Sequence, residues 1–187
     1  MANEPQREGK RLALLERLPK GGICAEVGVW EGGFSEVILE VTQPKELHLI
    51  DPWSYQPKFN NTAFGKDKNI EKMERLFNTV SDKFKDDPRV VIHRKMSDEA
   101  LASFPDGYFD WVYLDGNHNF DVVTQDLALS VQKVKPDGFI GGDDLLWKLD
   151  EGAPVRTAVR KLKKRLDGQT AFFRMGQQYL FDLHRAS

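Results

Sequence analysis

The sequence predicts an α/β fold: a doubly wound, seven-stranded sheet that is mostly parallel, with one antiparallel strand. Five short apolar runs alternate with segments of helical periodicity along most of the chain. Parallel neighbours need helix-length connections, so this alternation predicts parallel strands with helices on both faces. The last two strand-like runs, 171–174 and 178–183, are separated by only a short turn and must pair antiparallel. The reversed strand is therefore expected at or near an edge.

Apolar spacing and breaker residues locate each expected element. The strands are expected at 23–28, 46–51, 90–93, 109–115 and from 138 onward, before the final pair. The helices are expected at 11–18, 34–41, 68–84, 97–103, 120–134 and 155–166. Pro19 ends the first of these helices, and residues 1–9 are expected to form a loose terminus.

Length and composition indicate one globular domain spanning residues 1–187, with 1–22 as an N-terminal helix and lead-in. The formal net charge of −2 implies no general attraction to nucleic acid or to an anionic membrane. Cys24 is the only cysteine, which rules out an intramolecular disulfide and fits a reducing compartment. No apolar run approaches the ~20 residues of a membrane-spanning helix, and the N-terminus lacks a signal-peptide core. We therefore expect a cytoplasmic protein.

A glycine-containing turn, Gly28-Val-Trp-Glu-Gly-Gly33, follows the first expected strand. Glycine lets a ligand approach the backbone, so a strand, this turn and a helix N-terminus together favour a nucleotide-like ligand. The third position from Gly28 is Trp30, which departs from the dinucleotide-binding glycine pattern. Asp51, at the end of the next strand, is placed to bind two ribose hydroxyls. The alternative for Asp51 is a turn cap before Pro52.

Acidic residues and a histidine follow the fourth and fifth strands. Asp115 and His118 end one strand, and Asp143-Asp144 end the other. In open α/β sheets ligands bind outside the carboxyl ends of the strands, so these side chains are expected to converge in one pocket. Three carboxylates suit Mg²⁺ or a similar hard cation, which lowers the pKa of a coordinated hydroxyl while a neutral imidazole accepts its proton. The alternatives are that Asp143-Asp144 and His118 only cap helices.

The segment 52–66 is the one long stretch without a regular period, and it is a candidate lid loop. It contains Trp53, which together with Trp147 either forms a wall for a substrate or simply packs.

Four motifs together resemble class I S-adenosylmethionine-dependent methyltransferases. More narrowly they are similar to small metal-dependent O-methyltransferases related to macrocin O-methyltransferase, and more distantly to catechol O-methyltransferase. The resemblance covers about residues 23 to 183. The motifs are Glu26-Val-Gly28-Val-Trp-Glu-Gly32, Leu49-Ile-Asp51-Pro-Trp, Asp110-Trp-Val-Tyr-Leu-Asp115-Gly-Asn-His118 and Lys135-Pro-Asp-Gly138-Phe-Ile-Gly-Gly-Asp143-Asp144.

The resemblance implies a Rossmann-like methyltransferase fold and a role for each matching residue. For the cofactor, it assigns Glu26, Gly28 and Gly32 to the methionine and ribose end, Asp51 to the ribose hydroxyls, and Met96 with Ser97 to the adenine. For the chemistry, it assigns Asp115, Asp143 and Asp144 to a divalent metal, here Mg²⁺, and His118 to the general base.

The function implied is methyl transfer from S-adenosylmethionine to a hydroxyl of a small molecule, with a homo-oligomer left open. Two alternatives remain. Some relatives of this fold are called cephalosporin hydroxylases, which suggests a 2-oxoglutarate and iron enzyme, although such enzymes typically use two histidines and one carboxylate. The other alternative is a non-catalytic module that binds an adenosyl ligand without a metal.

Overall fold

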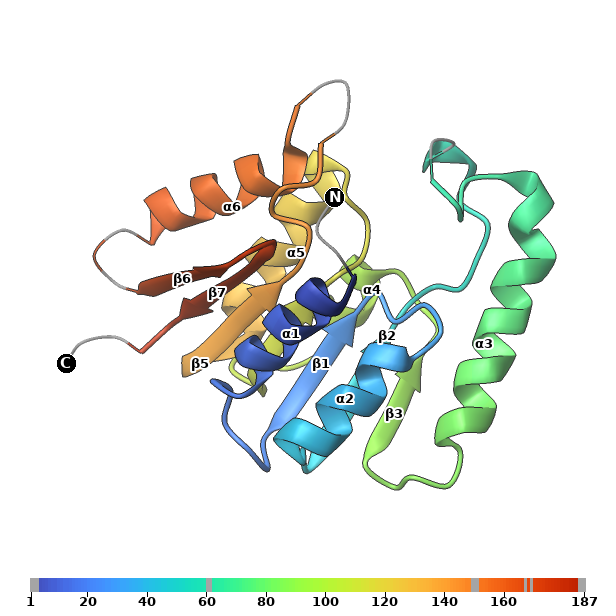
Figure 1. The fold of residues 1–187 in the computed structure, drawn as a ribbon, viewed down its shortest axis with the longest axis horizontal. Coiled ribbons are helices and arrows are strands. Elements are labelled where there is room, and N and C mark those ends of the chain that lie inside the picture. The colour runs from blue at the N-terminus through green and yellow to red at the C-terminus, as the bar shows by residue number, and fades with distance from the viewer. Residues whose placement is uncertain (1–3, 60–61, 149–151, 167, 169, 185–187) are drawn as a thin grey trace.

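A single seven-stranded sheet with helices on both faces organises the chain (Figure 1). The computed structural model describes residues 4–59, 62–148, 152–166, 168 and 170–184. The strand order is β3-β2-β1-β4-β5-β7-β6. The strands are β1 Ile23–Val27, β2 Glu46–Ile50, β3 Val90–His93, β4 Phe109–Leu114, β5 Val134–Gly142, β6 Ala171–Met175 and β7 Gln178–Asp182.

The pairing confirms the predicted fold class. β1 to β5 are mutually parallel, whereas β7 runs antiparallel to both of its neighbours, β5 and β6. The reversed strand therefore lies one place in from the edge formed by β6. The short turn between β6 and β7 forces this antiparallel pair, as the sequence predicts.

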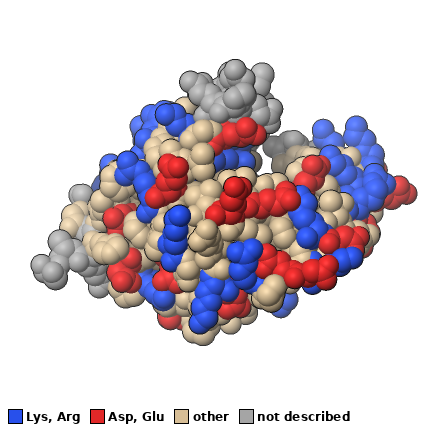
Figure 2. Space-filling view, turned by 60° about the horizontal axis from the view of Figure 1, so that its bottom comes forward, with Lys and Arg blue, Asp and Glu red and all other residues tan. Residues whose placement is uncertain are grey.

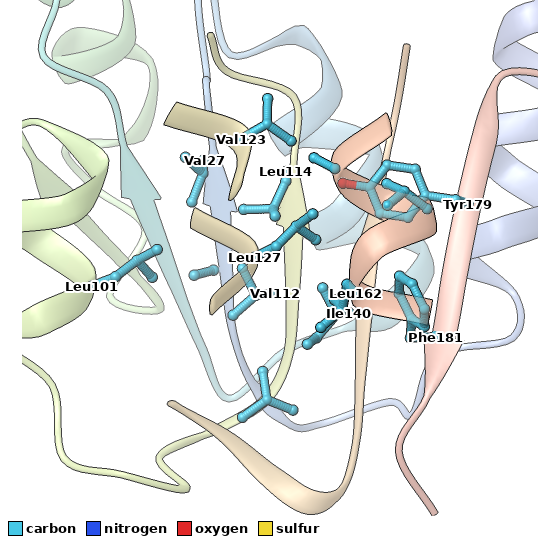
Figure 3. Close-up of a cluster of buried hydrophobic side chains, with 14 of the residues drawn as sticks. Val27, Leu101, Val112, Leu114, Val123, Leu127, Ile140, Leu162, Tyr179 and Phe181 are labelled. Carbon is cyan, nitrogen blue, oxygen red and sulfur yellow. The ribbon is translucent and has the colours of Figure 1, made fainter. Parts of the chain in front are cut away.

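Two hydrophobic clusters fill the space between the sheet and its helices. α1 Glu4–Leu15, α2 Gly33–Thr42 and α3 Ile70–Phe84 cover one face, and their cluster includes Leu14, Ile38 and Val80. α4 Ser97–Ala102, α5 Phe120–Lys133 and α6 Pro154–Arg165 cover the other face. Figure 3 shows this second cluster, in which Leu114 of β4 lies beside Leu127 of α5.

The N-terminal helix differs from the prediction. α1 begins at Glu4, within the stretch expected to be loose, and ends at Leu15 rather than Leu18; residues 1–3 lie outside the described part. Leu14 and Leu15 are fully buried, while hydrogen bonds such as Leu18 N to Leu15 O at 3.0 Å continue the turn. The first turns of α1 carry few apolar residues, so periodicity does not reveal them. Contacts with distant acidic residues hold them instead.

The fifth strand begins at Val134, four residues before the expected start at Gly138. The pairing with β4 shifts register between Phe109 and Trp111, which leaves Pro136 in the irregular part of the strand. Proline is tolerated at such a bulge because it removes no regular ladder hydrogen bond there.

Of the candidate lid loop 52–66, the structure describes residues 52–59 and 62–66. The loop includes the 3₁₀ turn η1 Pro57–Phe59, and a second turn, η2 Asp67–Asn69, leads into α3. Gln56 N donates to Phe64 O at 2.8 Å. Trp53 is 1% exposed and its Nε1 donates to Trp30 O at 2.9 Å, so the packing alternative is correct for Trp53.

The charged side chains are mixed on the face shown in Figure 2, where basic and acidic groups alternate over the surface. None of the helices in the described ranges is both long enough and apolar enough to cross a membrane.

Candidate active site

A cavity of about 460 Å³ opens at the carboxyl ends of β1, β2 and β4. Its wall combines the turn after β1, the start of α4, the turn after β4 and the segment 52–66. This is the position at which ligands bind in open α/β sheets. Of the residues predicted to bind cofactor or to act in catalysis, Gly28, Asp51, Met96, Ser97 and His118 line it.

Gly28 forms the point at which the turns after β1 and β4 touch. Its φ is +88°, and a Cβ placed there would lie 2.4 Å from the carbonyl oxygen of Asp115. No other residue can occupy this position without displacing the backbone of the second turn. The glycine therefore allows the two turns to come together beneath the cavity.

Asp51 holds the glycine-containing turn in place. One carboxylate oxygen accepts hydrogen bonds from Val29 N at 3.0 Å and Trp30 N at 3.1 Å, and the other accepts from Trp53 N at 2.8 Å. Burial raises the pKa of Asp51, and these three backbone donors oppose the rise. Asp51 therefore does cap the turn, as the alternative reading of the sequence predicts, and the same side chain also lines the cavity.

Glu26 and Gly32 are not among the residues that line the cavity. Glu26 is 2% exposed and accepts a hydrogen bond from Ser35 Oγ on α2. Burial raises the pKa of Glu26 to about 8, against the lowering effect of the Ser35 hydrogen bond. At Gly32, with φ +72°, a Cβ would lie 2.9 Å from the ring of Phe84, so this glycine permits close packing of α3.

Asp115, His118 and Asp144 form a group of potential metal ligands. One donor atom from each residue lies within 4.8 Å of the others, and His118 Nε2 is 2.8 Å from a carboxylate oxygen of Asp144. Burial raises the pKa of Asp115 to about 7, although Arg11 opposes the rise. Burial also acts to raise the pKa of Asp144, but the contact with His118 outweighs it and the net shift is downward. The two neighbouring carboxylates therefore differ in how readily they ionise.

Asp143 lies beside this group but points elsewhere. Its side chain is fully buried, and one oxygen accepts a hydrogen bond from Asp144 N at 2.7 Å. The other oxygen binds two arginines of α1, Arg7 at 2.7 Å and Arg11 at 2.7 Å. The structure thus brings His118, rather than Asp143, together with the two remaining acids, and Asp143 as a metal ligand stays a prediction.

The sequence reasoning did not identify Arg7 and Arg11 as site residues. They are four residues apart and therefore lie on one face of α1, next to the buried pair Leu14 and Leu15. This spacing indicates that the two arginines share a helix face. It does not indicate their acidic partners, which are more than 100 positions away in the chain.

Direct contacts decide the helix-capping alternative for His118. Asn119, not His118, caps α5, because its side chain accepts a hydrogen bond from Asp121 N at 3.0 Å. His118 instead stacks on Trp147, with ring centroids 5.2 Å apart, and Trp147 also lines the cavity. The wall alternative therefore fits Trp147.

The donor set of Asp115, His118 and Asp144 fits a divalent cation of the hard type, because carboxylate oxygens predominate. A two-histidine, one-carboxylate iron triad is not assembled within the described part of the chain, where the group found contains one histidine.

Comparison with known proteins agrees with this fold. A family model described as "Methyltransferase domain" matches residues 25–145. "Uncharacterized protein R132" of Acanthamoeba polyphaga mimivirus is 29% identical over 123 residues, which cover 64% of this chain and 49% of that protein. This chain thus spans about half the length of the curated relative it matches.

Two solved structures share the fold over nearly the whole chain. The O-methyltransferase NovP superposes with a TM-score of 0.68 at 17% identity, covering 94% of this chain and 80% of that one. SMU.1697c from Streptococcus mutans, in complex with SAH, superposes with a TM-score of 0.64 at 10% identity, covering 97% and 99%.

The fold and the family match define a class I S-adenosylmethionine-dependent methyltransferase domain. The chain belongs to the methyltransferase-domain family whose model spans residues 25–145.

Proposed function

We propose that this protein is an S-adenosylmethionine-dependent O-methyltransferase of the macrocin O-methyltransferase type, acting on a hydroxyl of a small molecule with a divalent cation, Mg²⁺ in the first instance. The observation that carries the proposal is the grouping of Asp115, His118 and Asp144, of which Asp115 and His118 line the cavity. The O-methyltransferase NovP, which shares the fold, supports the hydroxyl acceptor by analogy only.

The residues of the site divide into two roles under this proposal. Asp51 and the turn at Gly28 would bind the cofactor, with Met96 and Ser97 beside its adenine, since all four line the cavity. The carboxylates of Asp115 and Asp144 would hold the cation. A cation bound there would lower the pKa of a coordinated hydroxyl and fix its position.

His118 would accept the proton of that hydroxyl. Its ring lies against Trp147 and its Nε2 against Asp144, so two contacts fix its orientation. An imidazole held next to the acceptor oxygen can take up its proton. Methyl transfer from a sulfonium then requires alignment of the acceptor oxygen with the methyl group, which a rigid site supplies.

Calorimetry with S-adenosylhomocysteine (SAH) tests the cofactor site, and electron paramagnetic resonance with Mn²⁺ tests the cation site. We expect SAH to bind without any cation, and Mn²⁺ to bind to the wild-type protein but not to Asp115→Asn. Asp137→Asn is the matched control, because Asp137 is an exposed acid on β5. Normal Mn²⁺ binding by Asp115→Asn would reject the assigned cation site.

The role of His118 is tested with His118→Ala and a panel of small diols and sugars as methyl acceptors. We expect SAH and Mn²⁺ affinities to persist while methyl transfer from labelled S-adenosylmethionine is lost. If His118→Ala instead loses Mn²⁺ binding, His118 is a ligand of the cation and not the proton acceptor.

A further inference from the structure

Two arginines of α1 meet the three acids of the site. Arg7 Nε donates to Asp143 at 2.8 Å, and its terminal nitrogen lies 3.4 Å from Asp144 and 3.9 Å from Asp115. Arg11 Nε donates to Asp143 at 3.0 Å, and Arg11 also binds Asp115 directly. Arginine keeps its charge at any ordinary pH, so these contacts place two fixed positive charges against three acids.

Arg11 is held firmly in this arrangement. Its side chain is 19% exposed, and its guanidinium carbon lies 4.8 Å from the centre of the Phe34 ring. One turn further along α1, Leu14 and Leu15 are 0% and 1% exposed and anchor the helix to the sheet. The burial of these leucines therefore holds the helix backbone at Arg11 in place.

Arg7 is held less firmly. Its side chain is 35% exposed, and it lies one turn beyond Arg11, away from the buried leucines. Arg7 is the arginine that contacts Asp144, one of the two carboxylates assigned to the cation. A cation coordinated at ~2.1 Å by Asp115 and Asp144 would stand next to the guanidinium of Arg7, where like charges repel.

Gly9 separates the two arginines within the helix. It is exposed, and a Cβ placed on it would meet nothing within 4 Å, so packing gives no reason for glycine. Glycine inside a helix is less stable than alanine because it loses more backbone freedom on folding. The helix is therefore weakest between the arginine that is anchored and the one that is not.

We propose that Arg7 is an internal competitor of the divalent cation: it occupies the acidic site through Asp143 and Asp144, and cation binding displaces it by opening α1 at Gly9, while Arg11 remains bound. This inference rests on the cation site of the proposed function. It makes the first turns of α1 a reporter of cation occupancy.

Mn²⁺ binding, followed by electron paramagnetic resonance at constant pH and ionic strength, tests the competition. We expect Arg7→Gln to bind Mn²⁺ about tenfold more tightly than wild type, because removal of the competing charge favours the cation. Gly9→Ala should bind Mn²⁺ more weakly, because alanine stabilises the helix against opening. Lys10→Gln is the matched control, since Lys10 is exposed on the same helix, and its affinity should equal that of wild type.

Hydrogen exchange gives a readout that does not depend on catalysis. Mn²⁺ should accelerate exchange of the amides of residues 4–10 in wild type and leave those near Leu14 protected. Equal Mn²⁺ affinity of Arg7→Gln and wild type, or unchanged exchange in residues 4–10, would overturn the proposed displacement of Arg7. Either result would leave the cation site of the proposed function standing. If neither wild type nor any of the three variants binds Mn²⁺ while SAH binds normally, the cation site of the proposed function is overturned, and this inference with it.

Discussion

The carboxylate of Asp51 accepts the backbone N–H of Trp30 at 3.1 Å, across the gap between the ends of β2 and β1. Trp30 has a φ of +58°, a backbone conformation that non-glycine residues rarely adopt. The same carboxylate lines the cavity that the proposed function assigns to the cofactor. One side chain therefore both stabilises an unfavourable turn and presents a carboxylate to the cavity.

Replacing Asp51 should lower both the free energy of unfolding and the affinity for the cofactor. Asp51→Asn loses the charge and one acceptor oxygen, and hydrogen bonds to charged groups are worth ~1.5–3 kcal/mol each. We expect the free energy of unfolding in urea to fall by about 1–3 kcal/mol and SAH affinity to fall at least tenfold, on the same basis. Asp67→Asn, in the exposed turn η2, serves as control and should change neither quantity. Full SAH affinity in Asp51→Asn would show that Asp51 serves the turn alone.

Gly28 and Gly33 should respond differently to the same substitution. A Cβ on Gly28 would lie 2.4 Å from a backbone oxygen, whereas one on Gly33 would meet nothing within 4 Å. We expect Gly28→Ala to lower the free energy of unfolding by more than about 3 kcal/mol and to abolish SAH binding, as for other strained backbone positions. Gly33→Ala, at the first position of α2, should be neutral or slightly stabilising. Thermal unfolding and calorimetry measure both effects, and similar behaviour of the two variants would contradict the close contact of the turns.

Glu26 should make the protein less stable as the pH rises. Burial raises its pKa from 4.5 in the unfolded chain to about 8 in the fold, so the folded state binds a proton that the unfolded state has released. The stability contribution is therefore complete below pH 4.5 and is lost as the pH rises through about 8. Glu26→Gln should remove this dependence, which urea unfolding at a series of pH values between those limits measures.

The matched control for Glu26 is Glu40→Gln, because Glu40 is exposed on the same helix that carries Ser35. It should retain the wild-type loss of stability at alkaline pH. A Glu26→Gln profile that parallels wild type would show that the carboxylate is ionised in the folded state.

His48 should make the protein less stable as the pH falls. Its ring is 3% exposed and its Nδ1 lies 2.8 Å from His93 Nε2. Burial, followed by the neighbouring His93, lowers the pKa of His48 from 6.5 to about 4. The unfolded chain therefore binds a proton first, and stability present above pH 6.5 is lost as the pH falls toward about 4.

The variant that tests this is His48→Phe, because the site is surrounded by the rings of Phe104, Tyr108 and Phe109. We expect its free energy of unfolding to fall less between pH 7 and pH 5 than that of wild type, by about 1 kcal/mol or more. His184→Gln, at an exposed histidine, should follow wild type. An NMR titration of His48 with a midpoint near its unperturbed value would contradict the prediction.

Much of the fold was predictable from the sequence because its signals are local. Alternation of apolar runs with helical periodicity predicts the parallel strands, and a short turn predicts the reversed strand β7. The position of the candidate site was predictable for a similar reason. Asp51, Asp115 and Asp144 each follow a parallel strand, and the carboxyl ends of parallel strands lie at one edge of the sheet wherever the helices lie.

Only the tertiary structure decided which side chains share that edge. Arg7 and Asp143 are 136 positions apart, and no local pattern links a helical arginine to an acid at such a distance. Side-chain direction was equally hidden, because Glu26 turns to Ser35 while Asp51 turns to the glycine-containing turn. Periodicity along a chain specifies elements and the faces they bury, whereas charge pairing depends on where packed elements finally come to lie.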